Sequence, residues 1–241
     1  MGFPRKHPGR SDLGALQGIQ MVGKRTNSRQ RIIDHGEVFT PPELVNDMLD
    51  LVAHECERIE SRFLEPACGD GNFLAEVLRR KLLTVDVRNK SNRVKWERDA
   101  VLAVCSIYGI DLLTDNVELC RKRLLQTVRN KHEERFKEPL TDESDTAFSF
   151  ILSRNIIQGD ALSMRTSDDR PIVFSEWSPV NGSMLKRRDF AYDQLLNEAH
   201  IANLPLFNDL GKDVFIPTSV GEFPPCHYLK VFEAEQLVER S

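Results

Sequence analysis

The pattern of apolar positions predicts an amphipathic helix over residues 40–59. Thr40 is followed by two prolines and Glu43, an order typical of a helix N-terminus, where a hydroxyl caps the first turn and proline fits it. The apolar residues that follow repeat at helical spacing, and they are Leu44, Val45, Met48, Leu49 and Val52. They share one face, so we expect this helix to pack on a sheet.

A strand, a tight turn and a helix are predicted over residues 63–81. A short apolar run ends at Leu64, and Pro66 cannot continue a strand ladder. Gly69 and Gly71 permit positive φ angles and a close approach between the backbone and a ligand. The free N–H groups at the start of the helix are expected to point into this turn, where small polar ligands bind.

Two further strands are predicted, and each leads into an acidic residue. One lies around residues 106–110 and ends at Asp111. The other covers residues 151–158, and Asp160 follows it after a glycine. Parallel strands would bring these acids to the same edge of a sheet as the glycine turn.

The rest of the pattern completes an α/β fold. The polar stretches 84–98 and 137–148 predict loops. Residues 171–177 predict a fourth, buried parallel strand, and residues 189–199 predict a helix. Strands that alternate with helices in this way are typical of a doubly wound, mainly parallel sheet with helices on both faces.

Length and charge predict one domain with a basic arm. The chain has 241 residues, of which 40% are hydrophobic, enough for one α/β domain that we place at 31–241. Residues 1–31 carry seven Lys or Arg and one acid, hence +6, which leaves −10 for the remainder of a chain whose net charge is −4. A flexible arm over 1–30 fits a nucleic-acid contact, and a solvated leader without a partner is the alternative.

Cysteines, histidines and hydropathy argue against several classes of protein. The five cysteines are odd in number and form no CxxC pair, and the histidines lack ligand spacing, so neither a disulfide framework nor a metal site is expected. No apolar run approaches the roughly 18 residues of a membrane span. We therefore expect a cytoplasmic protein with no membrane or metal partner.

The glycine turn resembles a known cofactor motif. Residues 65–74, Glu-Pro-Ala-Cys-Gly-Asp-Gly-Asn-Phe-Leu, resemble the segment that holds S-adenosylmethionine (SAM) in the DNA adenine methyltransferases of restriction-modification systems. Residues 36–42, 108–112 and 156–162 resemble further motifs of this family, in the family's order. The resemblance covers about residues 30–165. It implies a fold of the class I SAM-dependent methyltransferase type, with SAM as cofactor and DNA as partner.

The resemblance also implies roles for individual residues. Glu65 is expected near the cationic methionine end of SAM, Asp111 at the ribose hydroxyls, and Asp160 beside the adenine. The expected cofactor-binding residues are Phe39, Thr40, Pro41, Glu65, Ala67, Gly69, Gly71, Asp111, Leu112, Asp160 and Ala161.

The fourth strand departs from the family pattern. Family members place an Asn or Asp, two prolines and an aromatic residue there, whereas this chain has Ser175-Glu176-Trp177-Ser178. Glu176 as an acceptor for an amino group and Trp177 as a stacking surface for an extruded base are the candidate catalytic residues. A strand end with a Trp in the core or at its rim is the alternative. No separate target-recognition domain is visible in the sequence.

Two functions are consistent with these motifs. The first is a DNA methyltransferase that transfers the methyl group of SAM to the exocyclic amino group of adenine. The second is a catalytically degenerate SAM-binding partner or regulatory subunit of a DNA modification system. RNA, protein or a small molecule as substrate is a third, weaker interpretation. If DNA is the substrate, a separate specificity or partner subunit could read the target sequence.

Overall fold

The computed structural model describes residues 40–90, 92–196 and 218–238, which belong to one compact unit, Phe39–Ser241. The predicted basic arm over 1–30 and the expected cofactor residue Phe39 lie outside the described residues. Within the described ranges, no helix combines the length and apolar character that crossing a bilayer demands.

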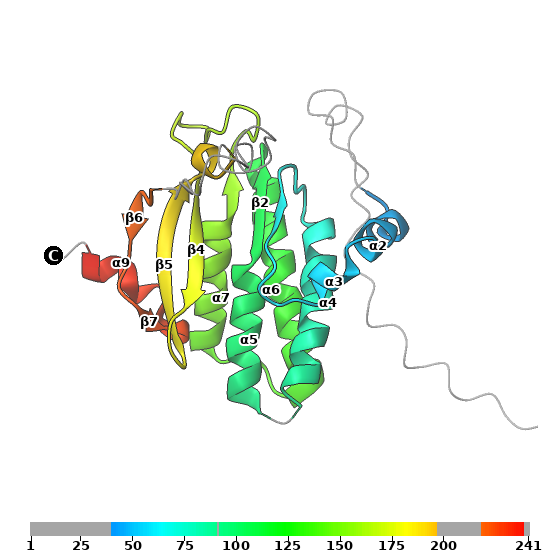
Figure 1. Cartoon of the computed structure of the whole chain (residues 1–241). Helices are drawn as coiled ribbons and strands as arrows, with labels where there is room; N and C mark the ends of the chain where they lie inside the picture. The colour runs from blue at the N-terminus through cyan, green and yellow to red at the C-terminus, as the bar shows by residue number, and fades with distance from the viewer. Residues whose placement is uncertain (1–39, 91, 197–217, 239–241) are drawn as a thin grey trace, which may run out of the picture. The chain divides into compact units, whose positions relative to one another are not determined.

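Three short parallel strands form the central sheet (Figure 1), in the order β1 (Phe63–Glu65), β2 (Ile107–Asp111) and β3 (Ile156–Gln158). Parallel neighbours require long crossover connections, and each connection here holds two helices. These are α4 (Asn72–Arg88) and α5 (Arg93–Cys105), then α6 (Thr114–Phe136) and α7 (Asp142–Asn155). The α/β fold with a parallel sheet is confirmed.

The two faces of this sheet are covered differently. Ile107 joins the large apolar cluster that the helices α4 to α7 build, whereas Tyr108 and Ile110 join a second cluster with Phe174 and Tyr192. Both crossovers run in the same direction along the sheet, so right-handed connections bring their helices to one face. In the described part of the chain the four long helices therefore cover one face of the sheet and not both. The other face packs on Phe174 of β4 and on the helical residues 192–196, whereas Trp177 of β4 and Leu185 of β5 join the helical cluster.

The predicted fourth parallel strand is wrong in direction. Strand β4 (Val173–Pro179) pairs antiparallel with β5 (Met184–Ala191) in a separate sheet. A tight turn with Gly182 at φ 54° joins the two strands, and such a short connection forces a hairpin. The predicted helix over 189–199 begins too early, because residues 189–191 still belong to β5 and helical backbone starts at residue 192.

The C-terminal residues complete this second sheet. Strand β6 (Gly221–Glu222) and strand β7 (Cys226–His227) both pair antiparallel with β5. The 3-10 turn η2 (Tyr228–Lys230) and helix α9 (Glu233–Val238) follow. Tyr228 and Val231 reach the main core, so this tail is packed against the helical side of the molecule.

Both predicted loops are largely helical. Helix α4 continues to Arg88, and α5 starts after Asn92, whose side chain accepts a hydrogen bond from the Lys95 N–H. Helix α7 starts after Thr141, whose hydroxyl accepts one from the Ser144 N–H. These caps offset the polar composition that suggested loops.

The helix predicted over 40–59 is divided in two. Helix α2 (Pro42–Asp50) is followed by the single turn α3 (Ala53–Cys56). Pro41, not Thr40, stands at the cap position of α2, and no side chain caps that end. Val45 and Leu49 are buried as expected, whereas Leu44, Met48 and Val52, which were predicted on the same packing face, are exposed.

Candidate functional site

The register of the parallel sheet brings the predicted acids to one edge. Glu65, the last residue of β1, pairs with Gly109 of β2, two residues before Asp111. Asp111, the last residue of β2, pairs with Gln158 of β3, two residues before Asp160. All three carboxylates thus follow the carboxyl ends of neighbouring parallel strands, where α/β folds bind ligands.

The glycine turn needs its two glycines. Gly69 has φ 53° and Gly71 has φ 84°, in the left-handed region that disfavours side chains. A Cβ atom on Gly71 would lie 2.6 Å from the Sγ of Cys120 in α6. Gly71 occupies the N-cap of α4, so the turn presents the start of that helix at the strand edge. Ala67 precedes these glycines in the same turn.

The Asp111 side chain joins this turn to the end of strand β2 by a hydrogen bond. Its Oδ2 accepts a hydrogen bond of 2.8 Å from the Gly69 N–H, and its Oδ1 accepts bonds from the Leu113 N–H at 2.9 Å and the Asn116 amide at 3.1 Å. A carboxylate offers about four acceptor positions. The side chain expected at the ribose hydroxyls therefore already orders the glycine turn.

Two carboxylates at the glycine turn, those of Glu65 and Asp70, receive fewer hydrogen bonds than they can accept. Burial raises the pKa of Glu65, although the Ala67 N–H bonds to it, and no cationic side chain of the described residues pairs with it. The Oδ1 of Asp70 is buried and has no hydrogen-bond partner among the described residues, while Oδ2 pairs with Arg123 at 2.6 Å. A cationic ligand that carries N–H groups would match these acceptors, which fits the methionine end of SAM.

The adenine side of the expected site is an open hollow. Leu112, Gly159 and Asp160 help to line a cavity of about 370 Å³. Asp160 accepts a hydrogen bond of 2.9 Å from the Leu162 N–H, and this contact and those with Ser163 lower its pKa, so its exposed carboxylate is ionised. Its neighbour Ala161 instead packs with the second apolar cluster.

The segment expected to close over the cofactor lies against the start of α4. The backbone carbonyl of Thr40 accepts a bond of 3.0 Å from the Asn72 side-chain amide, and the side-chain Oδ1 of Asn72 accepts one of 3.2 Å from Arg123. The Pro41 carbonyl accepts the Val45 N–H of α2 at 3.0 Å. Sequence reasoning missed Arg123, because nothing in its helical repeat marks it as a partner of a turn about 50 residues upstream.

The candidate catalytic residues lie elsewhere. Glu176 stands in the middle of β4, where it forms ion pairs with Arg62 and Arg188, the second at 2.6 Å. Trp177 is buried, and its Nε1 donates a hydrogen bond of 3.1 Å to the Asn155 side chain. Stacking of Trp177 on an extruded base does not fit this position, because its ring packs against Phe150 and Arg187 in the main core.

No cluster of metal ligands is formed by the part of the chain that the structure describes. The candidate site is therefore defined by carboxylates, glycines and helix N–H groups.

Comparison with known proteins gives one similar relative. No protein-family model matches the chain, and no solved structure matches it. The chain is 27% identical to the Type II methyltransferase M.VspI of Vibrio sp. (strain 343) over 108 residues, which are 45% of this chain and 21% of that protein. The chain thus spans about a fifth of the length of this relative, and the match supports a methyltransferase-family protein.

Proposed function

We propose that the strand edge formed by the glycine turn, Asp111 and Asp160 binds SAM, and that the chain is a DNA methyltransferase-family protein that acts on the exocyclic amino group of adenine. The observation that carries this proposal is the register that brings these groups together in the family's order. The similarity to a Type II methyltransferase supports it independently.

Each part of the edge has chemistry suited to part of SAM. Glu65 and Asp70 would hold the cationic methionine end, because both offer acceptors that the described residues leave incompletely paired. Asp111 would use its remaining acceptor capacity for a ribose hydroxyl, and Asp160 with Leu112 would face the adenine. SAM would supply an activated methyl group, so the chain's own contribution to the rate is positioning.

A SAM-binding partner or regulatory subunit is the second candidate function. It is favoured by the ion pairs that occupy Glu176 and by the burial of Trp177. Under this alternative a separate specificity or partner subunit holds the target base and reads the DNA. An amino group that attacks a methyl donor needs fixed acceptors for its hydrogens, whereas the Trp177 side chain has no acceptor and the Glu176 carboxylate is held by two arginines.

One experiment separates the two functions. The full chain is incubated with methyl-labelled SAM and DNA of mixed sequence, with and without candidate partner subunits, and the labelled product is located. Label in adenine with the chain alone supports the enzyme. Label that requires a partner subunit, together with SAM binding by the chain alone, supports the second function. Absence of SAM binding contradicts both.

A further inference from the structure

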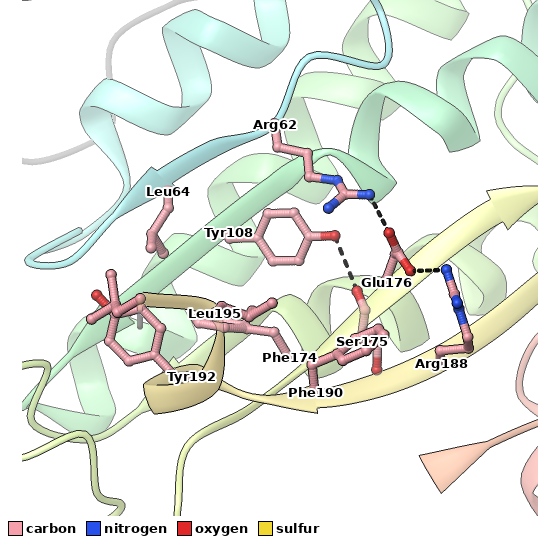
Figure 2. A pocket seen from close by; sticks show the side chains of 11 residues that line it. Arg62, Leu64, Tyr108, Phe174, Ser175, Glu176, Arg188, Phe190, Tyr192 and Leu195 are labelled. Atoms are coloured by element: carbon pink, nitrogen blue, oxygen red, sulfur yellow. Dashed lines mark hydrogen bonds and ion pairs between the residues drawn. The ribbon is translucent and has the colours of Figure 1, made fainter. Parts of the chain in front are cut away.

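A second cavity lies away from the proposed SAM site. It measures about 490 Å³ and lies on the sheet face opposite the long helices (Figure 2). Its lining residues come from β1, β2, β4, β5 and the helical residues that follow β5. None of them belongs to the glycine turn, and neither Asp111 nor Asp160 lines it. Its volume falls within the usual range of small-molecule sites.

Aromatic rings form the walls. Tyr108 and Phe174 pack edge to face with their centroids 5.4 Å apart, and Phe174 and Tyr192 do so at 5.6 Å. The Tyr108 hydroxyl donates a hydrogen bond of 3.1 Å to the Ser175 carbonyl, and burial raises the pKa of this phenol. These contacts hold the rings in place, so the wall offers fixed aromatic surface to a flat ligand.

Three charged side chains stand together at the cavity. Glu176 lies between Arg62 and Arg188 and forms an ion pair with each. One carboxylate shared by two guanidinium groups leaves this cluster with a net charge of +1. Each guanidinium has five N–H donors, and Glu176 occupies only some of them. Arg62 is 59% exposed and Arg188 is 38% exposed, so unused donors face an approaching ligand.

From this combination we propose that the cavity binds a flat aromatic compound that carries one anionic group, a carboxylate or a phosphate. The ring lies between the exposed Leu64 side chain and the aromatic wall at Tyr108, and the anionic group binds the free donors of Arg62 and Arg188. An anion between two guanidinium groups forms charge-assisted hydrogen bonds, which are stronger than neutral ones. The neutral analogue of such a ligand keeps the ring contacts and loses these bonds.

Binding to the full chain tests the proposal by titration calorimetry. 2-Naphthyl phosphate and 2-naphthoate are each compared with 2-naphthol, so the two arms distinguish a phosphate from a carboxylate. At least one anionic probe is expected to bind about tenfold more tightly than its neutral analogue. Equal affinity within both pairs, or no binding of either anionic probe at millimolar concentration, overturns the proposal.

Variants of the cavity complete the test. Arg62→Gln keeps the Glu176–Arg188 pair and is expected to weaken the anionic probe about tenfold. Leu64→Trp adds bulk at a lining residue and is expected to abolish binding without altering the charges. Arg170→Gln is the matched control, because this 77% exposed arginine pairs with Asp168 and does not line the cavity. Melting temperatures establish that each variant is folded.

The proposal is independent of SAM binding. If Arg62→Gln and Leu64→Trp bind the probe as the unaltered chain does, the assignment of the cavity is wrong. Binding of SAM is measured in the same variants and is expected to be unchanged. A chain that binds the anionic probe and not SAM contradicts the proposed function alone, and the reverse result contradicts this inference alone.

Discussion

The backbone N–H of Gly69 donates a hydrogen bond of 2.8 Å to the Oδ2 of Asp111, which lies 42 residues further along the chain. This bond joins the turn after β1 to the end of β2 and leaves Gly69 in the left-handed region. The acid predicted to contact ribose therefore also sets the shape of the turn. Changes at Asp111 are expected to affect stability and SAM binding together.

The first prediction concerns Asp111. Asp111→Ala removes the acceptor for Gly69, Leu113 and Asn116, so the free energy of unfolding should fall by about 1–3 kcal/mol and SAM should bind more weakly. Urea denaturation and calorimetry measure the two effects, and hydrogen exchange at the Gly69 amide should accelerate. Asp168→Ala, at an exposed ion pair, is the control. Unchanged exchange at Gly69 would show that the bond does not order the turn.

The second prediction compares two glycines of similar backbone conformation. Gly71→Ala places a Cβ atom 2.6 Å from Cys120 Sγ, whereas Gly182→Ala, also at positive φ, meets nothing within 4 Å. Gly182→Ala should cost only the backbone strain, about 1 kcal/mol, and Gly71→Ala clearly more, with loss of SAM binding. Chemical denaturation measures both. Equal losses of stability would contradict the close packing of the turn on α6.

The third prediction concerns the pH dependence of SAM binding. Because burial raises the pKa of Glu65 above its ordinary 4.5, this side chain remains protonated to a higher pH than an exposed glutamate. Only the ionised form attracts a cation, so SAM affinity should rise as the pH increases through the range above 4.5. Glu65→Gln should bind weakly with a flatter profile. Parallel profiles for the two proteins would remove Glu65 from the site.

The fourth prediction concerns Lys81, which is fully buried in α4. Its ammonium donates to the carbonyls of Arg58, Ile59 and Ser61, which lead into β1, and burial lowers its pKa to about 8. Between pH 8 and 10.5, the ordinary pKa of a lysine, the unfolded chain binds more protons than the folded one. Stability should therefore rise with pH in this window, by up to about 1.4 kcal/mol per pH unit.

Denaturation of the unaltered chain and of Lys81→Met at several pH values measures this term. The unfolding free energy of the unaltered chain minus that of Lys81→Met should increase from pH 8 upward. Lys90→Met is a surface control, because Lys90 lies at the exposed end of the connection between α4 and α5. A difference that is constant with pH would mean that Lys81 keeps an ordinary pKa.

The fifth prediction separates structure from catalysis at Trp177. Trp177→Phe leaves the Asn155 side-chain oxygen without its donor in a buried site, so stability should fall by about 1–3 kcal/mol. SAM affinity should not change, because Trp177 lies outside the strand edge. Denaturation and calorimetry on the same preparation test this. Loss of SAM binding by a stable Trp177→Phe variant would return this residue to the site.

The central strands and their acids could be predicted from the sequence because their signals are local. An apolar run that ends at Leu64 or Ile110 and leads into a turn residue fixes a strand end without knowledge of the rest of the fold. The first part of the helix over 93–105 was not predicted, because its buried Trp96 and its Asn92 cap are surrounded by charged residues that suggest solvent. Lys81 is charged and yet fully buried, so a prediction that places every charged residue at the surface fails for it.

The direction of β4 could not be read from its own residues. Its apolar members fit a buried parallel strand, and no strand was predicted over residues 184–188, which belong to its partner β5. The direction of β4 determines where the candidate catalytic residues Glu176 and Trp177 lie. Pairing with β5 sets Glu176 opposite Arg188 and directs Trp177 into the core, so neither lies at a strand end. The hairpin has a local signal, Asn181-Gly182 between the two strands, which our prediction of a parallel strand did not use.

Titration calorimetry of the full chain with SAM and with its demethylated product tests the central claim most directly. The account predicts saturable binding of one SAM per chain, a parallel rise in melting temperature, and loss of both in Gly71→Ala but not in Gly182→Ala. No heat and no thermal shift with either ligand at millimolar concentration would contradict it.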